Sequence, residues 1–224
     1  MSDRNDNATK RLIRETATRL FREKTFEAVT LGDICQACGI NKHTFYYYFK
    51  SKDELLESYY SLPWNLSAAE VTDILTSDNY VDQLWLIIQK FTDHIQTTGV
   101  PIVRQIFIKN LSEDMGTFRI GHEMRELCRL EISIIKKGQQ AGQFRNHADP
   151  KVLVILLQQI LYSLGLLWAI FQGEFEFGAR ARFLLENLLD VDIPYRTTLE
   201  ESVDQFTDLF TGASGTKGGN ENKK

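Results

Sequence analysis

The sequence contains few cysteines and prolines, 3 and 4 respectively among 224 residues. So few cysteines exclude a scaffold held by disulfides and are typical of a reducing compartment. The first fifteen residues are polar and charged, so they lack the apolar segment of a secretory signal. We therefore expect a protein of the cytoplasm.

Sequence motifs of common enzymes and metal sites are also missing. No GxSxG, Walker A or HExxH pattern occurs. Neither His94 nor His122 follows a glutamate by three residues, as a di-iron site in a helical bundle requires. We predict no metal, no cofactor and no enzymatic activity.

Two cysteines, Cys35 and Cys38, form a CxxC pair. No second ligand pair stands at the spacing that a zinc site needs. A redox dithiol normally sits at the start of a helix, whereas this pair lies on the apolar face of a predicted one. We predict small core residues, with a redox enzyme as the less favoured alternative.

The charge of the chain is unevenly distributed, although its net value is only −4. Residues 1–52 contain ten Lys/Arg and six Asp/Glu, whereas the remainder contains sixteen and twenty-four. A basic N-terminal part on an acidic body indicates a polyanionic partner that binds at one end of the molecule.

One long stretch, residues 152–173, has no charged residue. Its length alone would allow it to cross a bilayer. Gln158, Gln159 and Ser163 lie near its centre, where polar groups are most costly, and a strong Lys/Arg flank is lacking. A helix that is apolar on all sides is also typical of a protein core, so we predict a buried helix and no membrane. A membrane-associated or purely protein-binding helical module remains the alternative.

Residues 30–56 predict two short helices joined by a glycine turn. Thr30 and Asp33 have the spacing of a capping box at the start of the first helix. Gly39 stands where that helix should end, because glycine adopts the left-handed conformation at little steric cost. Asn41 can cap the second helix. A helix, a short turn and a helix form the arrangement that places a second helix in the DNA major groove.

The second helix of this unit has no acidic residue and carries three consecutive tyrosines. Successive helical residues point about 100° apart, so some of these phenols must be exposed. Exposed tyrosines beside lysines suit contact with phosphate, although a solvated aromatic helix or a protein-binding patch would have the same composition. We predict contacts to base edges or sugar from Lys42, His43, Thr44 and Tyr46, and contacts to phosphate from Tyr47, Tyr48, Lys52 and the helix start at Thr30.

This segment resembles the DNA-binding domain of the TetR family of transcriptional repressors. The sequence departs from the family pattern at His43, where a small residue is usual, and at Cys35 and Cys38, where alanines are usual. Outside the N-terminal region the resemblance is only architectural. The match covers roughly residues 8–58 and is carried by Thr30, Asp33-Ile34, Gly39, Thr44-Phe45-Tyr46, Tyr48-Phe49, Lys52 and Leu55.

We predict an all-α protein with three parts. Residues 1–50 form a three-helix DNA-binding domain, residues 51–211 a larger helical domain for ligand binding and dimerisation, and residues 212–224 a disordered tail. In the larger domain, apolar periodicity and capping residues predict helices over residues 52–62, 79–98, 103–111, 119–141, 150–173, 179–189 and 199–210.

The helices over residues 150–173 and 179–189 carry more apolar surface than one small domain can cover. A helix-turn-helix usually reads two half-sites one DNA turn apart, which requires two copies at a fixed spacing. The family resemblance implies a four-helix bundle with two helices from each protomer. We predict a homodimer with interface residues Leu156, Ile160, Leu164, Leu167, Trp168, Phe171, Phe183, Leu184 and Leu188.

The resemblance also implies a repressor that leaves a palindromic double-stranded DNA operator when an unidentified small molecule binds in the helical body. An apolar pocket with a few polar groups is the usual form of such a site. The sequence pattern of each candidate lining residue is equally typical of an ordinary core residue. The predicted lining residues are Trp85, Phe91, His94, Phe107, His122, Gln159 and Tyr162.

Overall fold

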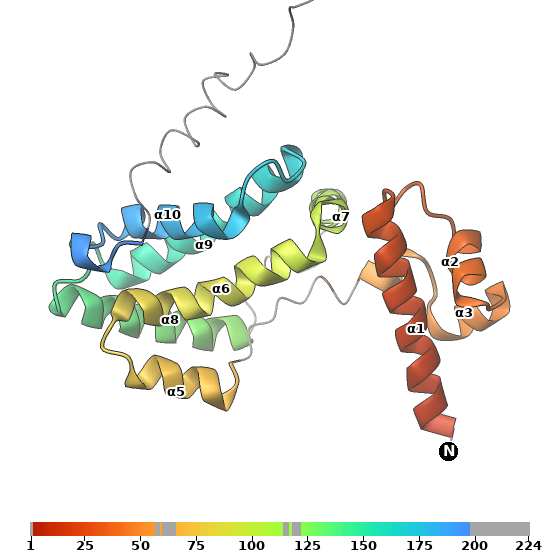
Figure 1. Ribbon diagram of the computed structural model, residues 1–224, viewed down its shortest axis with the longest axis horizontal. Helices are drawn as coiled ribbons and strands as arrows, with labels where there is room; N and C mark the ends of the chain where they lie inside the picture. The colour runs from red at the N-terminus through yellow and green to blue at the C-terminus, as the bar shows by residue number, and fades with distance from the viewer. Residues whose placement is uncertain (1, 57–58, 60–65, 114–116, 118–121, 198–224) are drawn as a thin grey trace, which may run out of the picture.

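The computed structural model describes residues 2–56, 59, 66–113, 117 and 122–197, and every regular element in these ranges is helical. The predicted all-α class is therefore confirmed. Figure 1 shows a small N-terminal body, made of the first three helices, beside a larger body that contains the remaining ones. The predicted helix over residues 199–210 and the predicted tail lie outside the described residues.

The small body is built from elements whose ends are set by local hydrogen bonds. Asp33 N–H donates to Thr30 Oγ1 at 3.1 Å and Thr30 N–H donates to the Asp33 carboxylate at 2.7 Å, so the predicted capping box is present. Gly39 has φ 66° and ends the first short helix, as predicted. The elements are α1 (Ser2–Glu23), α2 (Leu31–Cys38), α3 (Lys42–Tyr48) and the 3₁₀ turn η1 (Asp53–Leu56).

Apolar side chains from all three helices form a first buried cluster. Ile13 of α1, Ile34 of α2 and Phe45 of α3 have no exposed surface. Ile102 and Ile106, which belong to the larger body, are part of the same cluster. The small body is therefore attached to the larger one by shared apolar packing, which resists relative motion more strongly than polar surface contacts do.

The larger body is a bundle around a second buried cluster, in which α6 packs against α8 and α10, and α9 packs against α7, α8 and α10. Figure 1 shows α5 along the outer side of this bundle, beneath α6 and α8. The elements are α5 (Ala68–Thr76), α6 (Tyr80–Thr98), α7 (Val100–Ser112), α8 (His122–Gln140), α9 (Pro150–Ile170), α10 (Phe177–Leu188) and the 3₁₀ turn η2 (Ile193–Tyr195).

Helix α5 was not predicted, although the sequence contained its start signal. Ser67 Oγ accepts from Glu70 N–H at 3.3 Å, and the Ser67 N–H donates to the Glu70 carboxylate at 2.6 Å. This is a complete capping box. The weak apolar periodicity of the short helix concealed it. Among the side chains of α5 that the structure describes, Ile74 is the buried one.

Helix α9, which has no charged residue after Lys151, begins at Asp149 and Pro150 as predicted, with the Asp149 carboxylate accepting from Lys151 N–H at 2.8 Å. By length and composition it could cross a membrane, and it is the one helix in the described ranges that could. Half of its most apolar stretch is buried inside the protein, where Leu157 and Leu161 face the second cluster. Packing in the core accounts for the apolar residues on the buried side of the helix.

Candidate nucleic-acid interface and cavity

Helix α3 divides its side chains between the protein core and solvent. Phe45 is completely buried, whereas 56% of Tyr46 and 70% of Tyr47 is exposed. Lys42 and His43 at the start of the helix are exposed as well. The predicted exposure of some of the tyrosines is thus observed, and the exposed side presents phenol, imidazole and ammonium groups without a carboxylate.

Three other predicted DNA-binding residues, Thr30, Thr44 and Tyr48, have partners within the protein. The hydroxyl of Thr44 donates to Asn41 Oδ1 at 3.0 Å, and that of Thr30 donates to Asp33 at 2.6 Å. These hydroxyls shape the starts of α3 and α2. The first N–H groups of α2, just after Thr30, retain the geometry of an anion-binding helix end. The ring of Tyr48, which is half-buried, meets that of Tyr47 edge-on at 4.9 Å.

Lys52 occupies a different environment from the one predicted. Its ammonium group donates to the carbonyls of Phe26 at 2.7 Å and Val29 at 2.9 Å, and it lies 4.1 Å from the centre of the Phe26 ring. Two of its three donors therefore hold the loop between α1 and α2. These contacts favour a structural role for Lys52 over the predicted phosphate contact.

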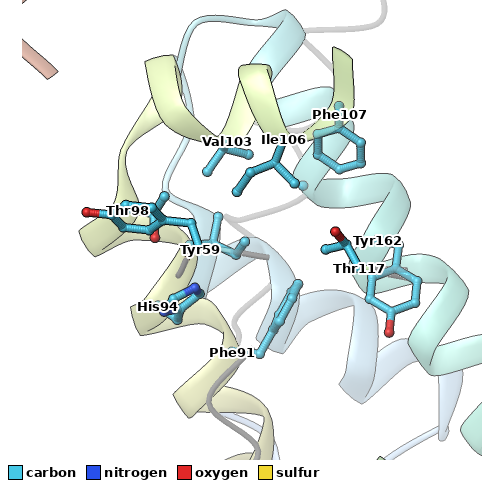
Figure 2. Close-up of a pocket in the computed structure, with 11 residues that line it drawn as sticks. Tyr59, Phe91, His94, Thr98, Val103, Ile106, Phe107, Thr117 and Tyr162 are labelled. Carbon is cyan, nitrogen blue, oxygen red and sulfur yellow. The ribbon is translucent and has the colours of Figure 1, made fainter. Parts of the chain in front are cut away.

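A cavity lies in the larger body, between α6, α7 and α9, and its empty space with the opening included is about 390 Å³. Figure 2 shows Phe91 and His94 of α6 on one side of it, Val103, Ile106 and Phe107 of α7 above, and Tyr162 of α9 opposite. Four predicted lining residues therefore line one cavity. The residues that the prediction missed are Tyr59, Ile95, Thr98, Val103, Ile106, Thr117 and Gly165.

The other three candidates do not contribute to the described lining. Trp85 lies near the opposite end of α6 and packs beneath the guanidinium of Arg182, 5.2 Å from the ring centre. Gln159 is exposed on the outer side of α9. Neither side chain lines the cavity, because a helix turns by about 100° per residue and sends neighbouring residues to different faces. The side chain of His122 lies outside the described part of the chain.

His94 has the most polar group at the cavity wall. Its Nε2 is buried and has no hydrogen-bond partner among the described residues. Burial lowers the pKa of the imidazole, with no charged neighbour opposing the effect. The ring is therefore neutral at pH 7, and one of its nitrogens is available to a partner inside the cavity.

A second polar group is buried behind Tyr162, between α8 and α9. The Glu131 carboxyl accepts from Gln158 Nε2 at 3.1 and 3.2 Å and is almost completely buried. Burial raises the pKa of Glu131 to about 8, and burial with the nearby Glu131 raises the pKa of Cys128 to about 11. Burial also raises the pKa of Tyr162 to about 12. These groups are mostly uncharged at neutral pH, so the cavity wall carries no charge from this side.

The cavity is connected to the small body by three contacts. Tyr59, which lines the cavity, shares a short hydrogen bond between its hydroxyl and that of Thr18 on α1. Thr98, another lining residue, accepts at its carbonyl from Arg22 Nε of α1 at 3.3 Å. Ile106 lines the cavity and also belongs to the first buried cluster. The cavity wall and α1 are thus joined by directly contacting groups.

The predicted dimer residues divide between core and surface. Leu164 is 3% and Trp168 8% exposed, and the Trp168 indole N–H donates to the Phe175 carbonyl at 3.0 Å. These two side chains stabilise the protomer's own core, and this part of the prediction is corrected. Leu156 is exposed, and the other predicted residues on α9, α10 and the turn after α9 are half-buried, namely Ile160, Leu167, Phe171, Phe183, Leu184 and Leu188.

The outer side of α9 forms an apolar stripe that the prediction largely missed. Besides Leu156, its exposed residues are Val152 at 47%, Ile155 at 56%, Leu166 at 37% and Ile170 at 57%. These positions lie along one side of the helix, in two groups near its ends that are separated by the exposed Gln159 and Ser163. An exposed stripe of this kind marks an interaction surface.

The cysteines fit a core role better than a chemical one. Cys35 is 6% exposed and belongs to the first buried cluster. Burial raises the pKa of the Cys35 thiol, and neighbouring Cys38 adds to this effect. Both are free thiols. A raised pKa disfavours the thiolate that redox chemistry and metal binding require.

Comparisons with known proteins agree with this geometry. Residues 13–59 match the family model of bacterial regulatory proteins, tetR family. The HTH-type transcriptional regulator YerO of Bacillus subtilis (strain 168) is 28% identical over 83% of this chain, a match that spans 65% of YerO. The HTH-type transcriptional regulator YhgD of the same organism is 23% identical over 71% of this chain and 83% of its own length. The chain thus spans less than two thirds of YerO.

Solved structures share the fold at low sequence identity. The TetR-family regulator PfmR from Thermus thermophilus has a TM-score of 0.55 at 22% identity, covering 80% of this chain and 97% of PfmR. Thermus thermophilus FadR, solved in complex with lauroyl-CoA, has a TM-score of 0.51 at 19% identity, covering 85% and 96%. The fold and the capped helix-turn-helix define a helix-turn-helix transcriptional regulator. The chain belongs to the TetR family of bacterial regulators.

Proposed function

We propose that the protein is a dimeric repressor that leaves a palindromic operator when a small molecule binds in the cavity between α6, α7 and α9. The observation that carries this proposal is the overlap between the cavity wall and the contacts to the small body. Tyr59, Thr98 and Ile106 take part in both. As a regulator of bacterial genes, it would act in the cytoplasm, where the DNA is.

The proposed division of labour follows the two buried clusters. We assign residues 1–50 to DNA binding and residues 51–211 to ligand binding and dimerisation. The clusters support this division except at η1 and α7. Leu55 and Leu56 of η1, and Ile102 and Ile106 of α7, join the cluster of the DNA-binding side. Helix α7 therefore contacts the DNA-binding body with one side and the ligand-binding body with the other.

For DNA recognition, we propose that α3 enters the major groove. Lys42, His43 and Tyr46 are exposed on it and would meet base edges or sugar, with Thr44 beside them. Lys42 is the best candidate to read guanine O6 and N7, because an ammonium donates to both acceptors.

Phosphate contacts would come from the edges of the same surface. Tyr47 is the most exposed of the tyrosines in α3, and Tyr48 adjoins it. The first N–H groups of α2, after Thr30, would add backbone donors. We leave Lys52 out of this set because two backbone carbonyls already hold its ammonium group.

Two copies are needed because a palindrome has two half-sites about one turn of DNA apart. We propose that the exposed stripe on α9, together with half-buried residues of α10, forms the interface. By linkage, a ligand that favours a dimer with misplaced α3 helices weakens DNA binding by the same factor as DNA weakens ligand binding.

The test is a fluorescence-anisotropy titration of the purified protein against the DNA that flanks its own gene, at two salt concentrations, beside random duplex of equal length. We expect tight binding of two protomers per palindrome with a steep salt dependence. Lys42→Ala should lose about 1–3 kcal/mol of discrimination between operator and random DNA, whereas Lys136→Ala, an exposed substitution on α8, should not. Binding no stronger than to random DNA would sink the repressor proposal.

A further inference from the structure

We propose that the cavity binds an uncharged, mainly hydrocarbon molecule of at most about a dozen non-hydrogen atoms, whose single hydroxyl group hydrogen-bonds to Nε2 of His94. This inference rests on the proposed function, since it names the class of ligand for the cavity that would control DNA binding. Four properties of the cavity support it: the wall, the imidazole, the other polar groups and the size.

The wall of the cavity suits hydrocarbon. Phe91, Ile95, Val103, Ile106 and Phe107 present apolar side chains. None of the described lining residues carries a charge at neutral pH. An ionised ligand would lose its hydration on entering the cavity and would find no opposite charge there. This loss is strongly unfavourable in an apolar environment.

The imidazole of His94 supplies one specific contact. Its Nε2 faces no partner among the described residues, and burial keeps the ring neutral. In Figure 2 the ring lies beside Phe91 at the edge of the cavity. A neutral imidazole nitrogen is either a donor or an acceptor, depending on the tautomer. A hydroxyl group fits both cases, because it donates and accepts.

Three of the other polar groups of the wall are already engaged or directed elsewhere. The hydroxyl of Tyr59 bonds with Thr18, and Thr117 Oγ1 accepts from Asn110 Nδ2 at 3.1 Å. Figure 2 shows the hydroxyl of Tyr162 pointing away from Val103 and Ile106. His94 is the lining residue, among those described, with a buried polar atom that lacks a partner. One hydrogen-bonding group on the ligand therefore satisfies the site.

The size has an upper limit in the empty space of about 390 Å³, which includes the opening of the cavity. A water-sized group occupies roughly 30 Å³ in a liquid, so the space accepts about a dozen non-hydrogen atoms at most. The aromatic rings of Phe91, Phe107, Tyr59 and Tyr162 favour a flat ring as part of the ligand, because aromatic pairs add attraction beyond burial.

The experiment is isothermal titration of the full chain with three matched probes. They are para-butylphenol, butylbenzene (no hydroxyl) and para-ethylbenzoate (an anion at neutral pH with as many non-hydrogen atoms as the phenol). We expect the phenol to bind at least about tenfold more tightly than either of the others, the effect of one satisfied buried hydrogen bond. His94→Leu should weaken phenol binding by about tenfold and leave butylbenzene binding unchanged, whereas His94→Gln should retain most of the preference. The matched control is His147→Leu at an exposed histidine, which should bind like the parent protein.

Each result decides the inference separately from the repressor proposal. Equal binding of the benzoate, unchanged phenol binding by folded His94→Leu, or no binding of the phenol would overturn the ligand class. Phenol binding that depends on His94 supports the proposed ligand class. If the phenol binds in this way but leaves the operator complex unaffected, the ligand class stands and the proposed coupling to DNA fails. A thermal melt of each variant confirms folding, and His94→Gln keeps the test valid if His94→Leu does not fold.

Discussion

Lys52 closes the loop between α1 and α2 by donating to the carbonyls of Phe26 and Val29. Its ammonium group also lies over the Phe26 ring, a favourable cation–π arrangement. Burial of the side chain lowers the pKa of Lys52, because partial removal from water disfavours the charged ammonium, and the nearby Asp53 and Glu27 oppose this effect. The loop leads directly into the capping box of α2, so Lys52 holds the chain at the start of the helix-turn-helix.

We expect Lys52→Ala to lower the free energy of unfolding by about 1–3 kcal/mol, because two carbonyls lose a charged donor. Urea denaturation measures this loss. Lys50→Ala, an exposed substitution two residues earlier, should change stability by less than about 0.5 kcal/mol. Stability equal to the parent combined with weaker binding to every DNA sequence would restore Lys52 as a phosphate contact.

Glu131 makes the stability of the protein depend on pH. Its ordinary pKa of 4.5 applies to the unfolded chain, whereas burial raises it to about 8 in the folded protein. Between these values the folded state binds more protons, so stability is fully present below about pH 4.5 and falls as pH rises through 8.

We expect Glu131→Gln to remove this fall, since the amide cannot ionise. The gain over the parent protein should be larger at pH 8 than at pH 5, at a slope of up to about 1.4 kcal/mol per pH unit. Urea denaturation at several pH values measures it, with Glu126→Gln at an exposed position of α8 as the control. Parallel curves for Glu131→Gln and the parent would contradict the raised pKa.

Helix α7 serves both bodies, because its two sides face different surroundings. Ile102 is buried in the cluster of the small body, whereas Val103 and Phe107 line the cavity. The ion pair between Lys109 Nζ and Asp53 at 2.6 Å adds a polar link from α7 to η1. A rigid helix shared in this way transmits displacement, since a packed core deforms little.

We expect Tyr59→Phe and Arg22→Ala to weaken the effect of ligand on DNA binding, since each removes a contact between α1 and the cavity wall. The measured quantity is the ratio of operator Kd values with and without saturating para-butylphenol. Each variant should reduce the coupling by about 0.5–2 kcal/mol. Arg19→Ala is the control, because Arg19 bonds to Glu23 on its own helix. Unchanged ratios in both variants would exclude this route.

The assembly is expected to depend on the outer stripe of α9. Exposed apolar side chains near both ends of α9 are costly in water, and a twofold axis brings the same side chains of a second copy against them. Charge at the middle of the stripe would then be buried in both protomers. In the proposed dimer, the stripe would set the spacing of the two α3 helices on DNA.

We expect Ile155→Asp to convert the dimer into monomers and to abolish tight operator binding. Burying one isoleucine contributes about 1.5–3 kcal/mol, and the symmetric interface contains it twice. Light scattering after size-exclusion chromatography measures the mass. Ile193→Asp is the matched control, because Ile193 is 75% exposed but lies away from α9, in η2. A stable dimer of Ile155→Asp would move the interface to another surface.

The local features of this protein follow from short-range chemistry in its chain. The ends of α2 and α3 are set by Thr30, Gly39 and Asn41 through hydrogen bonds that span only a few residues, so they were predictable. The start of α9 at Asp149 was predictable for the same reason. The start of α5 was equally readable at Ser67 and was overlooked.

Packing between distant segments decided the rest. The cavity joins Tyr59, His94 and Tyr162, and no local pattern shows that they meet. Lys52 donates to the carbonyls of Phe26 and Val29, which lie more than twenty residues away in the sequence, and no local pattern shows these contacts. On α9, which is apolar on nearly every side, burial of Leu164 and exposure of Ile155 depend on which neighbours cover each side. Hydrophobic attraction is non-directional, so the pattern of one helix cannot specify its neighbours, and only the assembled fold does.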